Sequence, residues 1–200
     1  MIAFANELVD DPIHFEPHRR EGALRLAYKT SRQSDRIDGI LRARVLDLRD
    51  RPDDVRGPER MKKLNTLRQW RCMDAMRCQV CGQPAVDVES GRVSWLLTET
   101  VFEATGADSG RTNAPPTCAG CVDDALKQCP MLQDNATLFT VAAAMPAGVL
   151  ADLYRPGRDL TPVLYGHNVF VPWNSGPAAH LRGALATCQV VHLHGMKAVT

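Results

Sequence analysis

Alternating apolar and polar positions predict strands at several places along the chain. Leu24, Leu26 and Tyr28 lie on one side of an extended stretch, with Arg25 and Lys29 opposite, as in a half-buried strand. Short apolar runs predict further strands at residues 93–97, 138–143, 163–165 and 169–171, the last two on either side of a turn at 166–168.

Residues 37–48 fit two patterns. Leu41, Ala43 and Val45 alternate with arginines, as in a strand. Five apolar residues would instead form a helical stripe: Ile37, Ile40, Leu41, Val45 and Leu48. Gly39 disfavours the helix, so we favour a strand that follows a turn.

Apolar residues that recur every three or four positions predict three helices. The first begins at Gly57-Pro58, and its stripe consists of Met61, Leu64, Leu67 and Trp70. A second, short helix would contain Ala147, Leu150, Leu153 and Tyr154. The third begins at Pro177 and ends near Gly195, with a stripe of Leu181, Ala184, Leu185, Cys188 and Val191.

Two Cys-x-x-Cys pairs carry the strongest chemical signal in the sequence. They are Cys78/Cys81 and Cys118/Cys121, and Gly82 follows the first pair directly. Four thiolates at this spacing can form a closed tetrahedral zinc site, so we expect a structural zinc ion. We also expect Thr117 to cap a helix that begins at Cys118.

The cysteine pairs and the sequence around them resemble HNH-type nucleases. Residues 68–82 end in Cys-x-x-Cys-Gly after an arginine-rich helix, and Asn113 precedes the second pair, as in that family. The resemblance covers about a quarter of the chain and implies a treble-clef zinc finger. It also implies a catalytic histidine between the pairs, which this chain lacks, because Trp95-Leu96-Leu97-Thr98 stands there instead. We therefore predict an HNH-like scaffold without nuclease activity.

The distribution of charge leaves the partner open. The formal net charge is only +1, yet residues 17–77 hold 17 Lys and Arg against 9 Asp and Glu. Such an asymmetry can mark a nucleic-acid surface, although arginines also simply solvate exposed elements. The candidate phosphate-binding residues are Arg42, Arg44, Lys62, Lys63, Arg68 and Arg71. A protein partner fits the zinc evidence equally well.

An enzyme is the alternative reading, with an active site outside the zinc module. Its candidate residues are His167, Asn168 and His180, with His192 as a further member. Cys188 and His192 would stand four residues apart on the third helix, a spacing that can bind a metal, although core packing explains them as well. Cys72 and Cys129 are expected to be buried thiols rather than ligands. A third possibility is a purely structural component of an assembly.

Together these observations predict an α+β protein in which the zinc module packs between two α/β segments. We expect a strand-rich segment at 1–57, a brace helix and zinc module at 58–130, and an α+β segment at 131–200, forming one compact unit. The start of the chain has no basic, apolar signal segment, and the most apolar window is too short to span a bilayer. We therefore expect a cytoplasmic protein with reduced cysteines and no membrane partner.

Overall fold

The computed structural model describes residues 2–18, 22–133, 135–173 and 178–199, without the side chains of residues 61, 62 and 178–180. Strands and helices are mixed along the chain, which confirms the α+β class. The chain divides into two compact units. The arginine unit comprises Ile2–Thr66 and Gly148–Cys188, and the cysteine unit comprises Leu67–Ala147 and Gln189–Thr200. Two long strands, β11 (Ala143–Pro156) and β13 (Ala184–His194), contribute residues to both.

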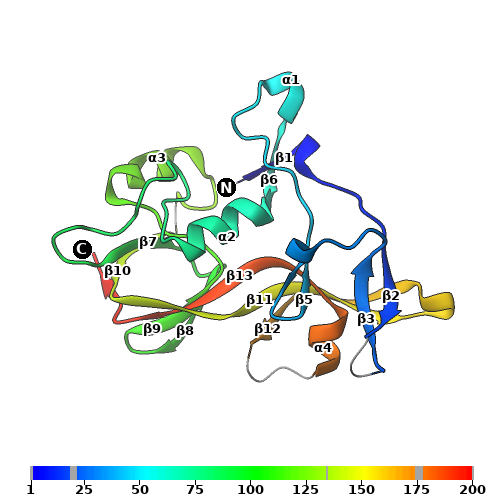
Figure 1. The fold of residues 1–200 in the computed structure, drawn as a ribbon. Helices are drawn as coiled ribbons and strands as arrows, with labels where there is room; N and C mark the ends of the chain where they lie inside the picture. Colours follow the sequence, from blue (N-terminus) through cyan, green and yellow to red (C-terminus); the bar gives the residue numbers. More distant parts are fainter. Residues whose placement is uncertain (1, 19–21, 134, 174–177, 200) are drawn as a thin grey trace. The chain divides into compact units, whose positions relative to one another are not determined.

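Short antiparallel pairs dominate the arginine unit (Figure 1). Its other strands are β1 (Ile2–Phe4), β2 (Ile13–Pro17), β3 (Leu24–Tyr28), β4 (Arg36–Ile37), β5 (Ile40–Arg42), β6 (Glu59–Leu64) and β12 (Pro162–Pro172). Its helical turns are η1 (Ala5–Glu7), η2 (Gln33–Asp35), α1 (Asp53–Arg56), η4 (Arg158–Leu160) and α4 (Ala178–Gly183). Four pairs are antiparallel, namely β1 with β6, β2 with β3, β4 with β5 and β11 with β12, whereas β5 runs parallel to β13.

A small apolar cluster holds the strands of the arginine unit together. Phe15, Leu26, Tyr28 and Leu41 are buried in it, and Tyr154 packs against them. These residues come from β2, β3, β5 and β11, so burial of their apolar surface ties four strands into one core.

The cysteine unit combines two three-stranded arrangements with two helices. Its elements are α2 (Thr66–Asp74), β7 (Val93–Leu97), β8 (Phe102–Gly106), β9 (Ser109–Thr112), η3 (Ala119–Cys121), α3 (Val122–Gln128), β10 (Thr137–Val141) and β14 (Lys197–Ala198). Strand β10 pairs with β7 and β14, and β9 pairs with β8 and with the last part of β13. Trp95 is fully buried in the core with Met73, Val141 and Leu193, and Cys78 belongs to the same cluster.

Most of the predicted strands are confirmed. The predicted strand at 24–28 is β3, the one at 93–97 is β7, and β10 covers most of the run at 138–143. The prediction of a strand in residues 37–48 is confirmed only as far as Arg42, because β4 and β5 pair around a turn at Asp38 and Gly39. Residues 43–48 form neither a helix nor a named strand, and Val45 makes an isolated bridge with Leu8. The runs at 163–165 and 169–171 belong to one strand, β12, in which the predicted turn is an irregularity opposite Leu153.

The prediction of a helix from Pro58 is wrong in its first half. Residues Glu59–Leu64 form β6, which pairs antiparallel with β1, and the helix α2 begins only at Thr66. Pairing with a strand more than fifty residues away outweighed the local helical pattern, since tertiary contacts routinely override propensity. The second half of the prediction is confirmed, because α2 still leads directly into the first cysteine pair.

The other two predicted helices are strands. Residues 147–154 lie in β11, where Val149, Ala151 and Leu153 are buried at every second position, and the register with β12 fixes that alternation. Of the helix predicted from Pro177 to near Gly195, only Ala178–Gly183 is helical, whereas Ala184–His194 forms β13. Val190 and Val191 are both buried there, so the strand is apolar on both faces. Its sequence therefore fits the period of a helix as well as that of a strand. Pro177 lies outside the described residues.

Candidate metal centre

The first cysteine pair lies on a tight turn that follows α2. Cys78 accepts a hydrogen bond from the Gly82 amide at 2.9 Å through its carbonyl, and its own amide donates to the Gln83 carbonyl at 2.8 Å. Gly82 has φ +74°, a left-handed conformation that glycine adopts without strain. The turn therefore presents both sulfurs from one short loop.

The second cysteine pair occupies a 3-10 turn rather than the first turn of an α-helix. Cys118 is extended, η3 covers Ala119–Cys121, and α3 begins at Val122. The predicted cap by Thr117 is wrong, because its side chain is fully buried and its hydroxyl accepts a hydrogen bond from Gln79 at 2.9 Å. Thr117 thus contacts the other cysteine turn instead of the helix end.

The four predicted cysteines converge on one point. The sulfurs of Cys78, Cys81, Cys118 and Cys121 all lie within 4.8 Å of one another, and the Cys81 and Cys118 sulfurs are 3.8 Å apart. A zinc ion with Zn–S bonds of about 2.3 Å in tetrahedral geometry separates its sulfurs by about 3.8 Å. The side chains therefore fit a tetrahedral metal ion with little adjustment, and these four residues could hold one.

The electrostatics of the four thiols also favour a cation. Burial opposes ionisation of Cys78, but backbone amides of Cys81, Cys118 and Val80 directed at its sulfur lower its pKa to about 7. Hydrogen bonding to Cys118 and burial raise the pKa of Cys121, and burial raises the pKa of Cys118. Because the pKa values of Cys118 and Cys121 are raised, a divalent cation would favour the thiolate form of these two residues.

Gln79 is a site residue that the sequence analysis missed. Its amide donates to the Pro116 carbonyl at 2.8 Å, and its side-chain Nε2 donates to Thr117 Oγ1 at 2.9 Å and to the Pro115 carbonyl at 3.3 Å. These bonds tie the first cysteine turn to the segment that leads into the second. No sequence signal marks this role, because any residue type is compatible with the position between two cysteine ligands.

Buried polar residues support the segment that precedes the second pair. The indole Nε1 of Trp95 donates to the Ala114 carbonyl at 2.7 Å. Gln69 on α2 donates to the carbonyls of Asn113 and Gln189, each at 2.9 Å, and accepts from the Gln189 amide. Asn113 is therefore held through its backbone, which keeps residues 113–117 beside the first cysteine turn.

Three further cysteines lie outside this group, namely Cys72, Cys129 and the buried Cys188 of β13. Cys72 on α2 is buried, as predicted, and its sulfur lies 3.9 Å from the Cys78 carbonyl rather than among the four sulfurs. Cys129 follows α3 and is partly buried. Within the described residues, the group of four cysteines is the one set of three or more His, Cys, Asp or Glu side chains able to share a metal ion.

The predicted phosphate-binding residues have different surroundings. Arg68 is buried, whereas Lys63 and Arg71 are exposed. Arg42 donates to the Ser34 carbonyl at 3.0 Å. The side chain of Lys62 lies outside the described residues. The nucleic-acid assignment stays a prediction.

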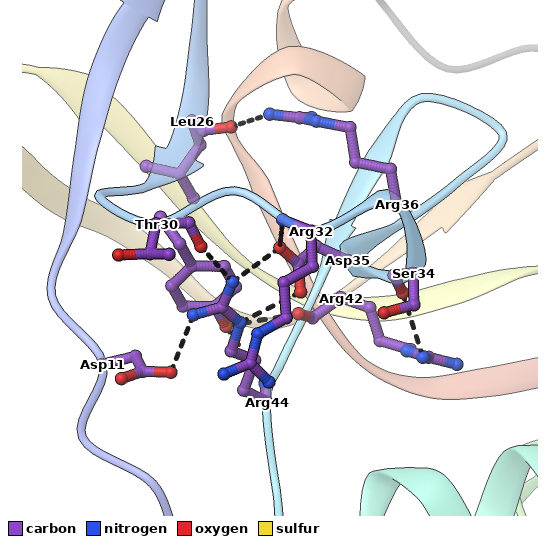
Figure 2. A network of polar contacts seen from close by, with 10 residues as sticks. Asp11, Leu26, Thr30, Arg32, Ser34, Asp35, Arg36, Arg42 and Arg44 are labelled. Atoms are coloured by element: carbon purple, nitrogen blue, oxygen red, sulfur yellow. Dashed lines mark hydrogen bonds and ion pairs between the residues drawn. The ribbon is translucent and has the colours of Figure 1, made fainter.

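Arg44 is the centre of a polar network in the arginine unit (Figure 2). Its guanidinium donates to Asp35 at 2.9 and 2.7 Å, to Asp11 at 2.8 Å and to the Thr30 carbonyl, and it lies over the Tyr28 ring at 4.1 Å from the centroid. The hydrogen bonds to Asp35 raise the pKa of Arg44. Burial opposes ionisation of Asp35, yet the bonds from Arg44 hold the pKa of Asp35 below its ordinary value.

The candidate histidines lie in different surroundings. His167 on β12 bonds through Nδ1 to Asp152 at 2.7 Å, and the same carboxylate accepts the Asn168 amide at 3.1 Å. His192 on β13 contacts Thr105 Oγ1 at 2.7 Å through Nε2, and its ring centroid is 4.3 Å from that of His194. Burial, then His194 and Arg111, lower the pKa of His192.

The predicted metal-binding pair of Cys188 and His192 is wrong. The pair required a helix, in which residues four positions apart lie on one face, but both residues lie in the strand β13. The side chain of His180 lies outside the described residues.

Comparison of the chain with protein-family models, with curated proteins and with solved structures finds no match. The resemblance to HNH nucleases therefore depends only on the residues quoted for it. Among the described residues, none of the helices combines the length and apolar character needed to cross a bilayer.

Proposed function

We propose that this chain is a zinc-stabilised protein that binds a macromolecular partner, and that its cysteine centre is structural. One observation carries the proposal, namely the convergence of four cysteine sulfurs within 4.8 Å. Sets of four thiolates favour zinc over the harder divalent ions. With four sulfur ligands a tetrahedral ion has no open position for water or substrate, so it stiffens a surface and performs no chemistry.

The metal would organise a treble-clef module within the cysteine unit. The turn at 78–82 supplies two ligands, and a short hairpin follows, in which Val86 and Val93 bridge across a turn at Asp87–Gly91. Cys118 and Cys121 supply the other two ligands just before α3. This order of turn, hairpin and helix supports the predicted module.

HNH nuclease activity is not part of this proposal. That chemistry needs a histidine between the cysteine pairs to activate water, and the sequence between Cys81 and Cys118 contains none. The buried core residue Trp95 and its neighbours Leu96 and Leu97 fill the corresponding strand, β7. Apolar side chains there stabilise the fold and offer no group for proton transfer.

Metal analysis of the purified full-length chain tests the structural centre. We expect one zinc ion per chain, and we expect cobalt to replace it with the intense visible absorption of tetrahedral thiolate coordination. Cys78→Ser should abolish that spectrum, whereas Cys129→Ser, outside the group of four, should leave it unchanged. A chain that binds neither metal, or a spectrum typical of six-coordinate cobalt, would contradict the proposal.

The class of partner is the second part of the proposal. Lys and Arg exceed Asp and Glu in the arginine unit, 17 to 14, whereas the cysteine unit holds 7 and 9. Nucleic acid is therefore expected to contact the arginine unit first, through residues such as Arg42 and Lys63. Retardation of DNA or RNA in a gel that weakens with salt supports this partner. If no retardation occurs at low salt, a protein partner is the remaining class.

An enzyme is a second candidate, favoured by one specific geometry. Asp152 orients the exposed His167 through Nδ1, which leaves Nε2 toward solvent, and this is how a carboxylate positions a general base. The neighbouring Asn168 has φ +55°, a conformation that non-glycine residues seldom adopt. Hydrolysis of model esters or phosphate esters that disappears in His167→Gln would support this candidate, and equal rates in both proteins would exclude it.

A further inference from the structure

The four sulfurs of the metal centre differ in their access to solvent. Cys78 is fully buried in the core of the cysteine unit, and Cys118 and Cys121 are partly buried. Cys81 is exposed, although it lies in the same group. A small polar oxidant therefore reaches the sulfur of Cys81 more easily than that of Cys78, since thiolate reactivity depends on access as well as on ionisation.

A partner thiol stands next to this exposed sulfur. The Cys81 and Cys118 sulfurs are 3.8 Å apart, and a disulfide needs about 2.05 Å, so closure requires a movement of roughly 1.8 Å. The two residues come from separate turns, and Gln79 ties the turn of Cys81 to residues 115–117 through three hydrogen bonds. This connection does not depend on a metal, so the two turns stay close when the ligands change.

We propose that Cys81 and Cys118 form a redox-sensitive pair through which a hydroperoxide releases the metal. The inference rests on the proposed zinc centre and assigns it a form of regulation. The Cys81 thiolate attacks the peroxide oxygen, which breaks the O–O bond and gives a sulfenic acid and hydroxide. The Cys118 thiolate then attacks the Cys81 sulfur, which forms the disulfide and expels a second hydroxide.

The electrons and ligands balance in this sequence. Two thiolates lose two electrons in total, and the peroxide accepts both as it becomes two hydroxide ions. The disulfide removes two of the four ligands, so Cys78 and Cys121 remain, and two thiolates bind zinc far more weakly than four. The new S–S bond also joins the same two turns that the metal joined, so the cysteine unit keeps one cross-link in either state.

The experiment treats the zinc-loaded full-length chain with hydrogen peroxide at neutral pH. We expect one zinc ion released for every two thiols lost, recorded with a chromophoric zinc indicator and a thiol assay, and a Cys81–Cys118 disulfide in peptide mass spectra. Dimedone should trap a sulfenic acid at Cys81 in the wild-type chain. A thiol reductant with added zinc should restore the starting state.

Variants separate this pair from the remaining cysteines. Cys118→Ser should let dimedone label Cys81 in larger amount, because the resolving thiol is missing, and Cys129→Ser should release zinc at the wild-type rate. A disulfide between Cys78 and Cys81, dimedone label on another cysteine, or thiol loss without zinc release would overturn the inference. Its failure is distinct from that of the zinc centre, because a chain without bound zinc or cobalt before peroxide is added contradicts the centre itself.

Discussion

The cysteine centre and the Arg44 network are two polar sites that are stabilised in opposite ways. Four thiols meet in the first, where burial and hydrogen bonding between the thiols keep the pKa values of Cys118 and Cys121 high, so an added cation would favour their thiolate forms. In the second, Arg44 brings its own positive charge to Asp35 and Asp11, and an aromatic ring covers it. The first site could be completed by a metal ion from solution, whereas the charges of the second are supplied within the chain.

This difference shows which part of the molecule is open to regulation. A site that depends on a metal responds to chelation, oxidation and protons, because each of these competes for its ligands. A site built from a guanidinium and carboxylates is not affected by chelation or oxidation, and protons disrupt it only when they titrate its carboxylates. The four predictions below test that contrast.

Removal of the metal should have the largest effect. We expect chelation, or Cys78→Ser, to cost at least about 3 kcal/mol, which lowers the Tm of a chain of this size by roughly 10 °C. Thermal melting followed by circular dichroism, with zinc content measured in parallel, provides the test. Cys129→Ser is the matched control and should melt like the wild type. Equal melting temperatures for zinc-loaded and zinc-free protein would remove the contrast between the two sites.

Arg44→Ala should destabilise the arginine unit without changing the zinc content. The substitution leaves the Asp35 carboxylate, which is 5% exposed, without its main cation, and breaking such a buried pair costs about 3 kcal/mol. Arg42→Ala is the neighbouring control and should cost less, since it leaves the Arg44–Asp35 pair in place. Urea unfolding gives both values. Zinc content should equal that of the wild type, and a loss of zinc in Arg44→Ala would mean that the two sites are not independent.

Acid should affect the two sites in separate pH windows. Protons compete with the metal for Cys78, whose pKa is about 7, and for Cys118 and Cys121, whose pKa values are raised, so zinc affinity should fall as the pH decreases, and more steeply below about 7. Asp35 has a folded pKa below its ordinary 3.8. Its contribution is therefore fully present above that value and is lost only as the pH falls through the lower folded pKa.

A zinc indicator and circular dichroism, recorded on the same acid titration, distinguish these windows. We expect zinc release first and a second, more acidic step in stability that is missing in Arg44→Ala. Release of zinc only below pH 4, together with the second step, would show that the two sites do not respond to acid in separate windows.

Gln79→Ala should give the smallest effect, because it removes two side-chain hydrogen bonds and leaves the four ligands in place. Mutation of a residue that orients metal ligands typically lowers the metal affinity by about tenfold or more. We expect zinc affinity about tenfold lower in a competition titration with a chelating dye. Gln83→Ala, an exposed glutamine at the other end of the same turn, is the control and should keep the wild-type affinity. No change in Gln79→Ala would show that the backbone alone holds the two turns together.

The sequence determined the metal ligands and several short strands. Each cysteine pair is a local motif of four residues, so spacing alone identified Cys78, Cys81, Cys118 and Cys121, and the structure brings these four together. Strand β3 and strand β7 were predictable because short runs between turn residues have few alternatives. These signals lie within a few residues of one another and do not require knowledge of the partner strand.

Only the tertiary structure decided the rest. Residues 59–64, 147–154 and 184–194 carry apolar spacing that fits a helix, yet pairing with distant strands made each of them extended. The roles of Gln79 and Arg44 likewise depend on partners that are 9, 33 and 38 positions away in the sequence. Hydrogen-bond partners and burial are properties of the folded chain, so a local sequence pattern cannot predict them. A Cys-x-x-Cys motif, in contrast, identifies metal ligands by residue type and spacing alone.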